Sequence, residues 1–402
     1  MPMELRREDK LLLDCLKLNG NVDQEKLSNL ERLTAEDWNL IAQRSVRHSV
    51  APLLYFCLKQ SGLHVPATTS EKLHELYLGS VASNLHLYHE LSKRLQVLKD
   101  ASIPVVVLKG AHLGEIVYGY IGLRPMSDAD LLLKKEDLAR GQKRLMDAGH
   151  SPFSNQIRLD LQWNIESSVD YLKIDMKKIW ERARPEVIAG VEVLVLCPED
   201  LILHICLHLS FQHLFQLAGV RSLCDIRESI EHYNRKIKWT QVCSHASEWG
   251  VRNSVYLTLL LARDMMGANV PDDVMEDLKP DEFDHRVKTW AANQIASAVV
   301  APAISPFFFQ LWKPGSFYEK ISLLRKLLLP APEIISQDYP APFGSVRNYL
   351  YYAVRLKDHF RRYARATRRI LKGDEHMTLL VERQNRNIAM REWLAPNYGR
   401  KA

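Results

Sequence analysis

Two aspartates, Asp128 and Asp130, stand two residues apart at the start of an apolar run that reads Asp-Ala-Asp-Leu-Leu-Leu. Because side chains alternate along a β-strand, residues i and i+2 project from the same face. Two carboxylates on one face repel each other, and a divalent cation with oxygen ligands, Mg²⁺ or Mn²⁺, best explains their pairing. A third carboxylate nearby would complete a two-metal site, which aligns an attacking hydroxyl and a leaving pyrophosphate in phosphoryl-type transfer.

The third carboxylate is expected on a neighbouring strand. Residues 168–176 alternate well enough to form one, and Asp175 is placed in it to join the pair. Asp170 competes for this role, although its local register fits less well. Taken alone, two aspartates at this spacing also occur at solvated strand edges and in turns, so the surrounding residues decide the interpretation.

Three residues near the aspartates are candidates for binding phosphate. Gly110 lies between a short β-branched run and a helix, where a glycine lets phosphates approach the backbone N–H groups of the helix N-terminus. A plain tight turn explains this glycine equally well. Lys109 could add a point charge, and the planar guanidinium of Arg124 could clamp phosphate oxygens.

Two further sets of residues have helical spacing. His204 and His208, with His213 beyond them, favour hydrogen bonding in the core over metal binding, because no carboxylate or cysteine completes a ligand set. Arg221 and Asp225 are also four residues apart. They predict an ion pair on one helix, with the alternative that Arg221 faces the nucleotide.

The type of secondary structure expected around these residues changes along the chain. Residues 1–100 are periodic at helical spacing, including one long segment over 69–99. Residues 101–197 alternate strands with helices and predict an α/β core. The strands are expected at residues 104–108, 129–133, 168–176 and 191–195, and the helices at 110–118 and 136–148. We predict a helical domain over 198–345 that forms the other wall of a cleft, and a basic helical tail over 346–402.

The composition is that of a soluble globular protein. Of the 402 residues, 47% are apolar and 25% are charged, which excludes wholesale disorder. The six cysteines are widely spread without paired spacing, so we expect reduced core thiols and a cytoplasmic location. The first ten residues are charged where a signal peptide would be apolar, and no apolar run is long enough for a transmembrane segment.

Residues 354–372 predict a basic amphipathic helix, because they hold eight Lys or Arg and a single Asp. Such a helix could contact RNA, an acidic protein or an anionic membrane surface. A terminal helix packed on the body with its arginines in water explains the same pattern. No recognised nucleic-acid-binding motif accompanies it, so support for a nucleic-acid partner is weak.

The stretch VVVLKGAHLGEIVYGYIGLRPMSDADLLL, residues 105–133, resembles the DNA-polymerase-beta-type nucleotidyltransferase superfamily. More closely, it is similar to a bacterial branch of largely uncharacterised nucleotidyltransferases, with a Leu-Lys-Gly turn followed by Arg-Pro-x-x-Asp-x-Asp-Leu. The similarity continues through residues 197–208 and 221–226 and through Trp239, and covers roughly residues 30–340. It implies an α+β fold, in which a small mixed-sheet nucleotidyltransferase core is flanked by N-terminal and C-terminal helical regions.

The resemblance also implies a function. Asp128, Asp130 and Asp175 would be catalytic metal ligands, with Lys109, Gly110 and Arg124 around the triphosphate. The expected activity moves a nucleoside monophosphate, AMP from ATP by default, to an acceptor such as a small molecule or peptide in a biosynthetic pathway. The alternative is a catalytically silent member that binds nucleotide, a protein or RNA. Two positions depart from the pattern, with alanine at 111 for serine or glycine, and lysine at 177 for histidine.

Overall fold

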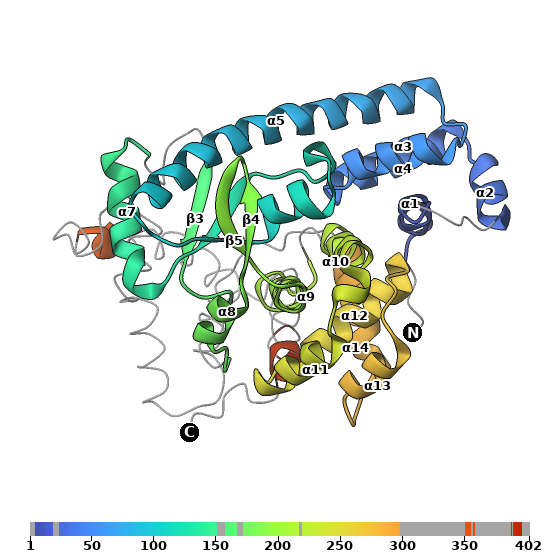
Figure 1. Cartoon of the computed structure of the whole chain (residues 1–402). Helices are drawn as coiled ribbons and strands as arrows, with labels where there is room; N and C mark the ends of the chain where they lie inside the picture. The colour runs from blue at the N-terminus through green and yellow to red at the C-terminus, as the bar shows by residue number, and fades with distance from the viewer. Residues whose placement is uncertain are drawn as a thin grey trace. The chain divides into compact units, whose positions relative to one another are not determined.

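The computed structural model describes residues 5–18, 24–150, 157–166, 172–216, 219–297, 350–354, 357, 387 and 389–395 (Figure 1). The chain forms two compact units. One comprises Met1–Val299 with Trp393–Ala402, and the other comprises Val300–Glu392. Every strand of the described chain lies in the first unit. The basic helix predicted over 354–372 falls almost entirely outside the described residues.

Five strands form one mixed sheet in the order β3-β2-β1-β5-β4. They are β1 (Val106–Val107), β2 (Asp128–Leu132), β3 (Arg158–Gln162), β4 (Arg184–Ile188) and β5 (Val191–Val195). The pairs β1–β5 and β2–β3 are parallel, whereas β1–β2 and β4–β5 are antiparallel. This sheet, flanked by helices, confirms the predicted α+β class with a small mixed-sheet core.

The predicted strands are confirmed at three of four places, β1, β2 and β5. The strand predicted over 168–176 is wrong where it is described, because residues 172–175 are not extended into a strand and Met176 begins helix α8 (Met176–Arg182). Residues 168–171, which include Asp170, lie outside the described residues. Strands β3 and β4 were not predicted. Pro185 lies within β4, where its missing N–H is tolerated because β4 is at the edge of the sheet.

The long predicted helix is confirmed as α5 (Ala67–Asp100), which Figure 1 shows running along the sheet. Its Leu91, Leu95 and Leu98 are fully buried and belong to one apolar cluster with Ala129 and Leu131 of β2. Each such leucine contributes about 1.5–3 kcal/mol through burial. Since one face of β2 is thus covered by α5, the alternate residues of β2 must project from the opposite face.

Helices account for most of the rest of the described first unit. The N-terminal ones are α1 (Arg7–Leu16), α2 (Gln24–Glu31), α3 (Ala35–Arg47) and α4 (Ala51–Ser61). Within the core lie α6 (Lys109–His112), continued as a π-helical turn to Val117, and α7 (Leu138–Asp147). After the sheet come α9 (Pro198–Leu207), α10 (Gly219–Tyr233), α11 (Trp239–Glu248), α12 (Arg252–Met266), α13 (Asp272–Leu278) and α14 (His285–Ser297). Helix α9 packs against α10, α11 and α12. The boundaries predicted at 100/101, 197/198 and 345/346 stay predictions.

The six cysteines are all buried and unpaired, in agreement with the expected core thiols. Burial raises the pKa of each thiol, for example to about 12 in Cys57. Among the described helices, none combines the length and the apolar character that a membrane crossing requires.

Gly122 allows the turn before β2 to pack closely against α5, which gives a first testable prediction. A Cβ on Gly122 would overlap the Val81 side chain and approach Tyr77 to 3.1 Å. We therefore expect Gly122→Ala to lower the free energy of unfolding by about 1–3 kcal/mol in urea titrations. Gly79→Ala is the matched control, because nothing lies near a Cβ there and alanine should stabilise α5 by about 1 kcal/mol. A Gly122→Ala protein as stable as wild type would contradict this packing.

Candidate functional site

Strand β2 presents Asp128 and Asp130 on the face that α5 does not cover. Ala129 and Leu131 alternate with them and are fully buried, whereas both aspartates are half-buried. The sequence expected both carboxylates on one face, and the backbone of β2 gives them this arrangement.

A third carboxylate comes from the neighbouring strand. Asp160 of β3 is in register with Asp130 of β2 across the parallel pair. Residues paired in this way project from the same face of a sheet. Partial desolvation and the negative charges of Asp130 and Asp128 raise the pKa of Asp160, which shows that the three carboxylates repel one another. Asp128, Asp130 and Asp160, which we call the carboxylate face, are therefore oxygen donors of the kind that Mg²⁺ and Mn²⁺ prefer.

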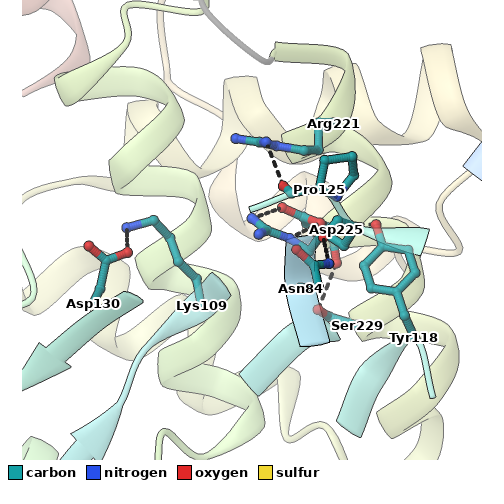
Figure 2. Close-up of polar contacts among 9 residues, drawn as sticks. Asn84, Lys109, Tyr118, Pro125, Asp130, Arg221, Asp225 and Ser229 are labelled. Carbon is teal, nitrogen blue, oxygen red and sulfur yellow. Dashed lines mark hydrogen bonds and ion pairs between the residues drawn. The ribbon is translucent and has the colours of Figure 1, made fainter. Parts of the chain in front are cut away.

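Lys109 provides positive charge at the carboxylate face. Its Nζ lies 2.9 Å from Oδ2 of Asp130, and each of the two side chains is 13% exposed (Figure 2). Burial acts to raise the pKa of Asp130, but the Lys109 ammonium outweighs it and holds that pKa below its usual range. The Lys109 ammonium thus occupies the position beside Asp130 in which a metal cation would balance the carboxylate charge. In this arrangement no three His, Cys, Asp or Glu side chains of the described chain are grouped to hold a metal.

Gly110 follows β1 and lies close to the loop before β2. A Cβ there would be 3.5 Å from Met126 Sδ and 3.7 Å from Arg124 Nη1, which are ordinary contacts. The described neighbours of Gly110 therefore do not require glycine at this position. The predicted role of Gly110 beneath a phosphate stays a prediction.

Arg124 is engaged inside the protein. Its Nε donates to Oδ1 of Asp225 and its Nη2 to Oδ2, both at 2.9 Å, and the arginine is 6% exposed. Tyr118 donates its hydroxyl to the same carboxylate at 2.9 Å. Although burial acts to lower the pKa of Arg124, the Asp225 charge raises it above its ordinary value. Asp225 therefore pairs with Arg124 rather than with Arg221, which corrects the ion pair expected from helical spacing.

The network around Arg124 fixes the loop that leads into β2. Asn84 of α5 donates from Nδ2 to the Arg124 carbonyl at 2.9 Å and also to the Ile121 carbonyl. Ser229 of α10 donates to the Asp225 carbonyl at 2.7 Å. Figure 2 shows this network and the Lys109–Asp130 pair as separate groups of contacts. These contacts give Arg124 a positioning role, while its predicted contact with phosphate stays a prediction.

Three histidines of α9 and the π-helical turn after it lie near Lys109. Burial, together with the Lys109 charge, lowers the pKa of His204 to about 3 and of His213 to about 4, and lowers that of His208 well below its usual range. The rings of His208 and His213 meet edge to face at 4.4 Å. These imidazoles are therefore neutral at physiological pH. His204 is buried in the core, but neither of its ring nitrogens has a hydrogen-bond partner among the described residues, so the predicted hydrogen bonding stays a prediction.

Asp175 lies at the start of a helix and not in the strand predicted for it. It is the N-cap of α8, and its Oδ1 accepts from the backbone N–H groups of Lys177 and Lys178 at 3.0 and 3.4 Å. Its predicted role as third metal ligand stays a prediction, and the register of β2 and β3 favours Asp160 instead. Sequence reasoning missed Asp160, although the Arg-Leu-Asp-Leu-Gln alternation around it could have revealed the strand.

Two substitutions separate these assignments. Asp175→Ala should lower the free energy of unfolding by about 1 kcal/mol through loss of the cap, with unchanged Mg²⁺-dependent nucleotide affinity. Asp160→Asn should weaken that affinity while leaving α8 capped. Urea unfolding and calorimetric titration of ATP with Mg²⁺ measure the two effects. The opposite pattern, with affinity lost in Asp175→Ala and kept in Asp160→Asn, would return the third position to Asp175.

Comparison with known proteins identifies the family of the chain. The model of a family described as an uncharacterised nucleotidyltransferase matches residues 34–267, which is more than half of the chain and includes the whole sheet. The match is shorter than the 30–340 span over which the sequence resemblance was expected. Neither a curated protein nor a solved structure matches the chain. The matched span contains the carboxylate face, Lys109 and the Arg124–Asp225 pair, and the chain belongs to this nucleotidyltransferase family.

Proposed function

We propose that this protein transfers a nucleoside monophosphate, AMP from ATP by default, to an acceptor and releases pyrophosphate. Membership of the nucleotidyltransferase family supports nucleotide transfer. The observation that carries the proposal to particular residues is the register of β2 and β3, which pairs Asp130 with Asp160 while Asp128 shares their face. The sequence assigned the third position to Asp175, which remains the alternative.

Asp128, Asp130 and Asp160 would hold the cation, because their donor atoms are all carboxylate oxygens and their mutual repulsion favours a positive charge. When bound, Mg²⁺ or Mn²⁺ supplies activation of the acceptor hydroxyl and neutralises charge on the leaving pyrophosphate. Lys109 then exchanges the Asp130 carboxylate for a phosphate oxygen, since its ammonium is a flexible point charge. Gly110 keeps the place beneath the triphosphate that the resemblance implies for it.

The acceptor is proposed to be a small molecule or a peptide hydroxyl, and the reaction is proposed to take place in the cytoplasm. Both points rest on the resemblance and on the composition rather than on a contact in the site. A nucleic-acid acceptor has only the basic residues 354–372 in its favour. The acceptor must approach the carboxylate face, because its hydroxyl has to lie beside the α-phosphate of the nucleotide that this face would hold.

A second candidate function has one specific observation in its favour. The Lys109–Asp130 ion pair neutralises a carboxylate without any metal, as expected of a catalytically silent member that binds nucleotide or a protein or RNA partner. The two candidates differ in what happens to this pair. Transfer requires Asp130 to exchange Lys109 for a cation, whereas a silent protein keeps the pair throughout.

The test uses each of the four NTPs labelled at the α-phosphate, with Mg²⁺ and pools of hydroxyl-bearing sugars, amino acids, short peptides and tRNA. We expect the label of one NTP to enter a product larger than the NMP, with an equal amount of pyrophosphate released. Asp128→Asn should lose both signals. If every acceptor pool leaves the label in the NTP, while Asp128→Asn binds ATP as tightly as wild type, the silent alternative takes its place.

A further inference from the structure

Arg221 is a half-buried arginine that has no carboxylate partner among the described residues. It lies near the start of α10, and its Nη1 donates to the Pro125 carbonyl at 3.1 Å. Its Nε is buried and has no hydrogen-bond partner in the described part of the chain. A guanidinium offers five donors in a planar fork, so most of its capacity is unused here.

Four arginines are more fully buried among the described residues of the first unit, and each is paired with a carboxylate. The pairs are Arg44 with Asp9, Arg94 with Glu90, Arg124 with Asp225, and Arg227 with Glu228. Arg221 differs because Arg124 occupies the nearby Asp225. Burial and the positive charge of Arg124 both lower the pKa of Arg221, so this cation lies in a position that costs stability. A cation left without an internal partner in such a place suits an anionic ligand.

The surroundings of Arg221 indicate which ligand that is. Pro125, to which it donates, lies three residues before Asp128, and the Asp128 charge is close enough to act on the Arg221 guanidinium. Figure 2 shows this guanidinium extending from α10 past Pro125 towards the side on which Lys109 and Asp130 lie. The free donors therefore lie on the side of the carboxylate face, where a cation and a polyphosphate would meet.

We propose that Arg221 binds the polyphosphate of the nucleotide, at the β- and γ-phosphates that leave as pyrophosphate. This inference rests on the proposed function, and it names Arg221 as the residue that binds the leaving pyrophosphate. A guanidinium fork donates two parallel hydrogen bonds to one phosphate, which suits the unused Nε and Nη2 of Arg221. Arg124, the arginine that the sequence favoured for this role, uses its Nε and Nη2 on Asp225.

The test is a calorimetric titration of inorganic tripolyphosphate, and separately of adenosine, in the presence of Mg²⁺. Arg221→Gln should weaken tripolyphosphate binding by about 10- to 100-fold, because a charged hydrogen-bond pair is lost. Arg221→Lys should keep part of the affinity, since it keeps the charge without the fork. Arg235→Gln is the matched control, because Arg235 is exposed just after α10 and should leave affinity unchanged. The melting temperature of Arg221→Gln should equal or exceed that of wild type, since an uncompensated charge is removed.

The outcomes separate this inference from the proposed function. Wild-type tripolyphosphate affinity in Arg221→Gln, or absence of binding by wild type, overturns the role of Arg221. An equal loss of adenosine affinity in Arg221→Gln overturns it as well, because the change would then not concern phosphate. If Arg221→Gln loses tripolyphosphate alone while labelled NTP is never transferred, Arg221 stands as a polyphosphate-binding residue and the proposed transfer fails.

Discussion

Replacing Asp130 by asparagine is expected to abolish metal binding at the carboxylate face, and with it nucleotide transfer. Asparagine keeps the shape of the side chain but removes the negative charge that a divalent cation needs. Loss of a residue that only orients a metal ligand costs about 10- to 100-fold in affinity or activity, so we expect loss of a ligand to exceed about 100-fold. Electron paramagnetic resonance of Mn²⁺ titrated into the protein measures the affinity directly.

Two controls accompany Asp130→Asn. Asp147→Asn removes an exposed aspartate that pairs with Lys143 at 2.7 Å on α7, and should leave Mn²⁺ affinity unchanged. Lys109→Met/Asp130→Asn removes the lysine that the single variant leaves without its carboxylate, and should regain stability but not Mn²⁺ binding. Unchanged Mn²⁺ affinity in Asp130→Asn would show that the cation binds elsewhere.

Breaking the Arg124–Asp225 pair should have the largest effect on stability. Both residues are almost fully buried, at 6% and 2% exposed, and are joined by two hydrogen bonds. Removal of one partner leaves an uncompensated buried charge, which costs about 3–5 kcal/mol. We therefore expect Asp225→Asn and Arg124→Met each to lower the free energy of unfolding by about this amount in urea titrations.

The double variant tests whether the two charges act as a pair. Arg124→Met/Asp225→Asn should be more stable than the sum of the single effects predicts, with a coupling energy of about 1–3 kcal/mol. Tyr118→Phe removes a single hydrogen bond to the same carboxylate and should cost about 1 kcal/mol. Strictly additive single effects would contradict the pairing. Because Arg124 lies four residues before Asp128, the single variants should also weaken nucleotide affinity by disturbing the loop into β2.

The sequence predicted those features that depend on neighbouring residues. Alternation around Asp128 and Asp130 identified their shared face, and helical periodicity identified α5 within two residues of its observed ends. Both features arise from local spacing, which a single sequence carries. Contacts between residues far apart in the chain cannot be predicted in this way, because they depend on the order of strands in the sheet. Asp160 is thirty residues beyond Asp130, and nothing in local alternation indicates that β3, rather than a strand near Asp175, lies beside β2.

The ion pairs also show that local spacing does not predict contacts between residues far apart in the chain. Arg124 and Asp225 are 101 residues apart in the chain, while Arg221 and Asp225 have the spacing of a helical pair. Local spacing therefore favoured the partner that the structure does not use. The difference is physical, since helical neighbours gain only about 0.2–0.5 kcal/mol from pairing, whereas removing one partner of a buried ion pair costs about 3–5 kcal/mol. Prediction of the site thus failed where burial, rather than spacing, selects the partner.

The most direct test of the proposed site is a calorimetric titration of ATP into the wild-type protein with Mg²⁺ and, separately, with EDTA. The carboxylate face is negatively charged and should repel a free triphosphate, so binding is predicted only when Mg²⁺ is present. Equal affinity in EDTA would contradict a metal–triphosphate site on β2 and β3. Absence of binding by the folded protein with any of the four NTPs and Mg²⁺ would contradict it as well.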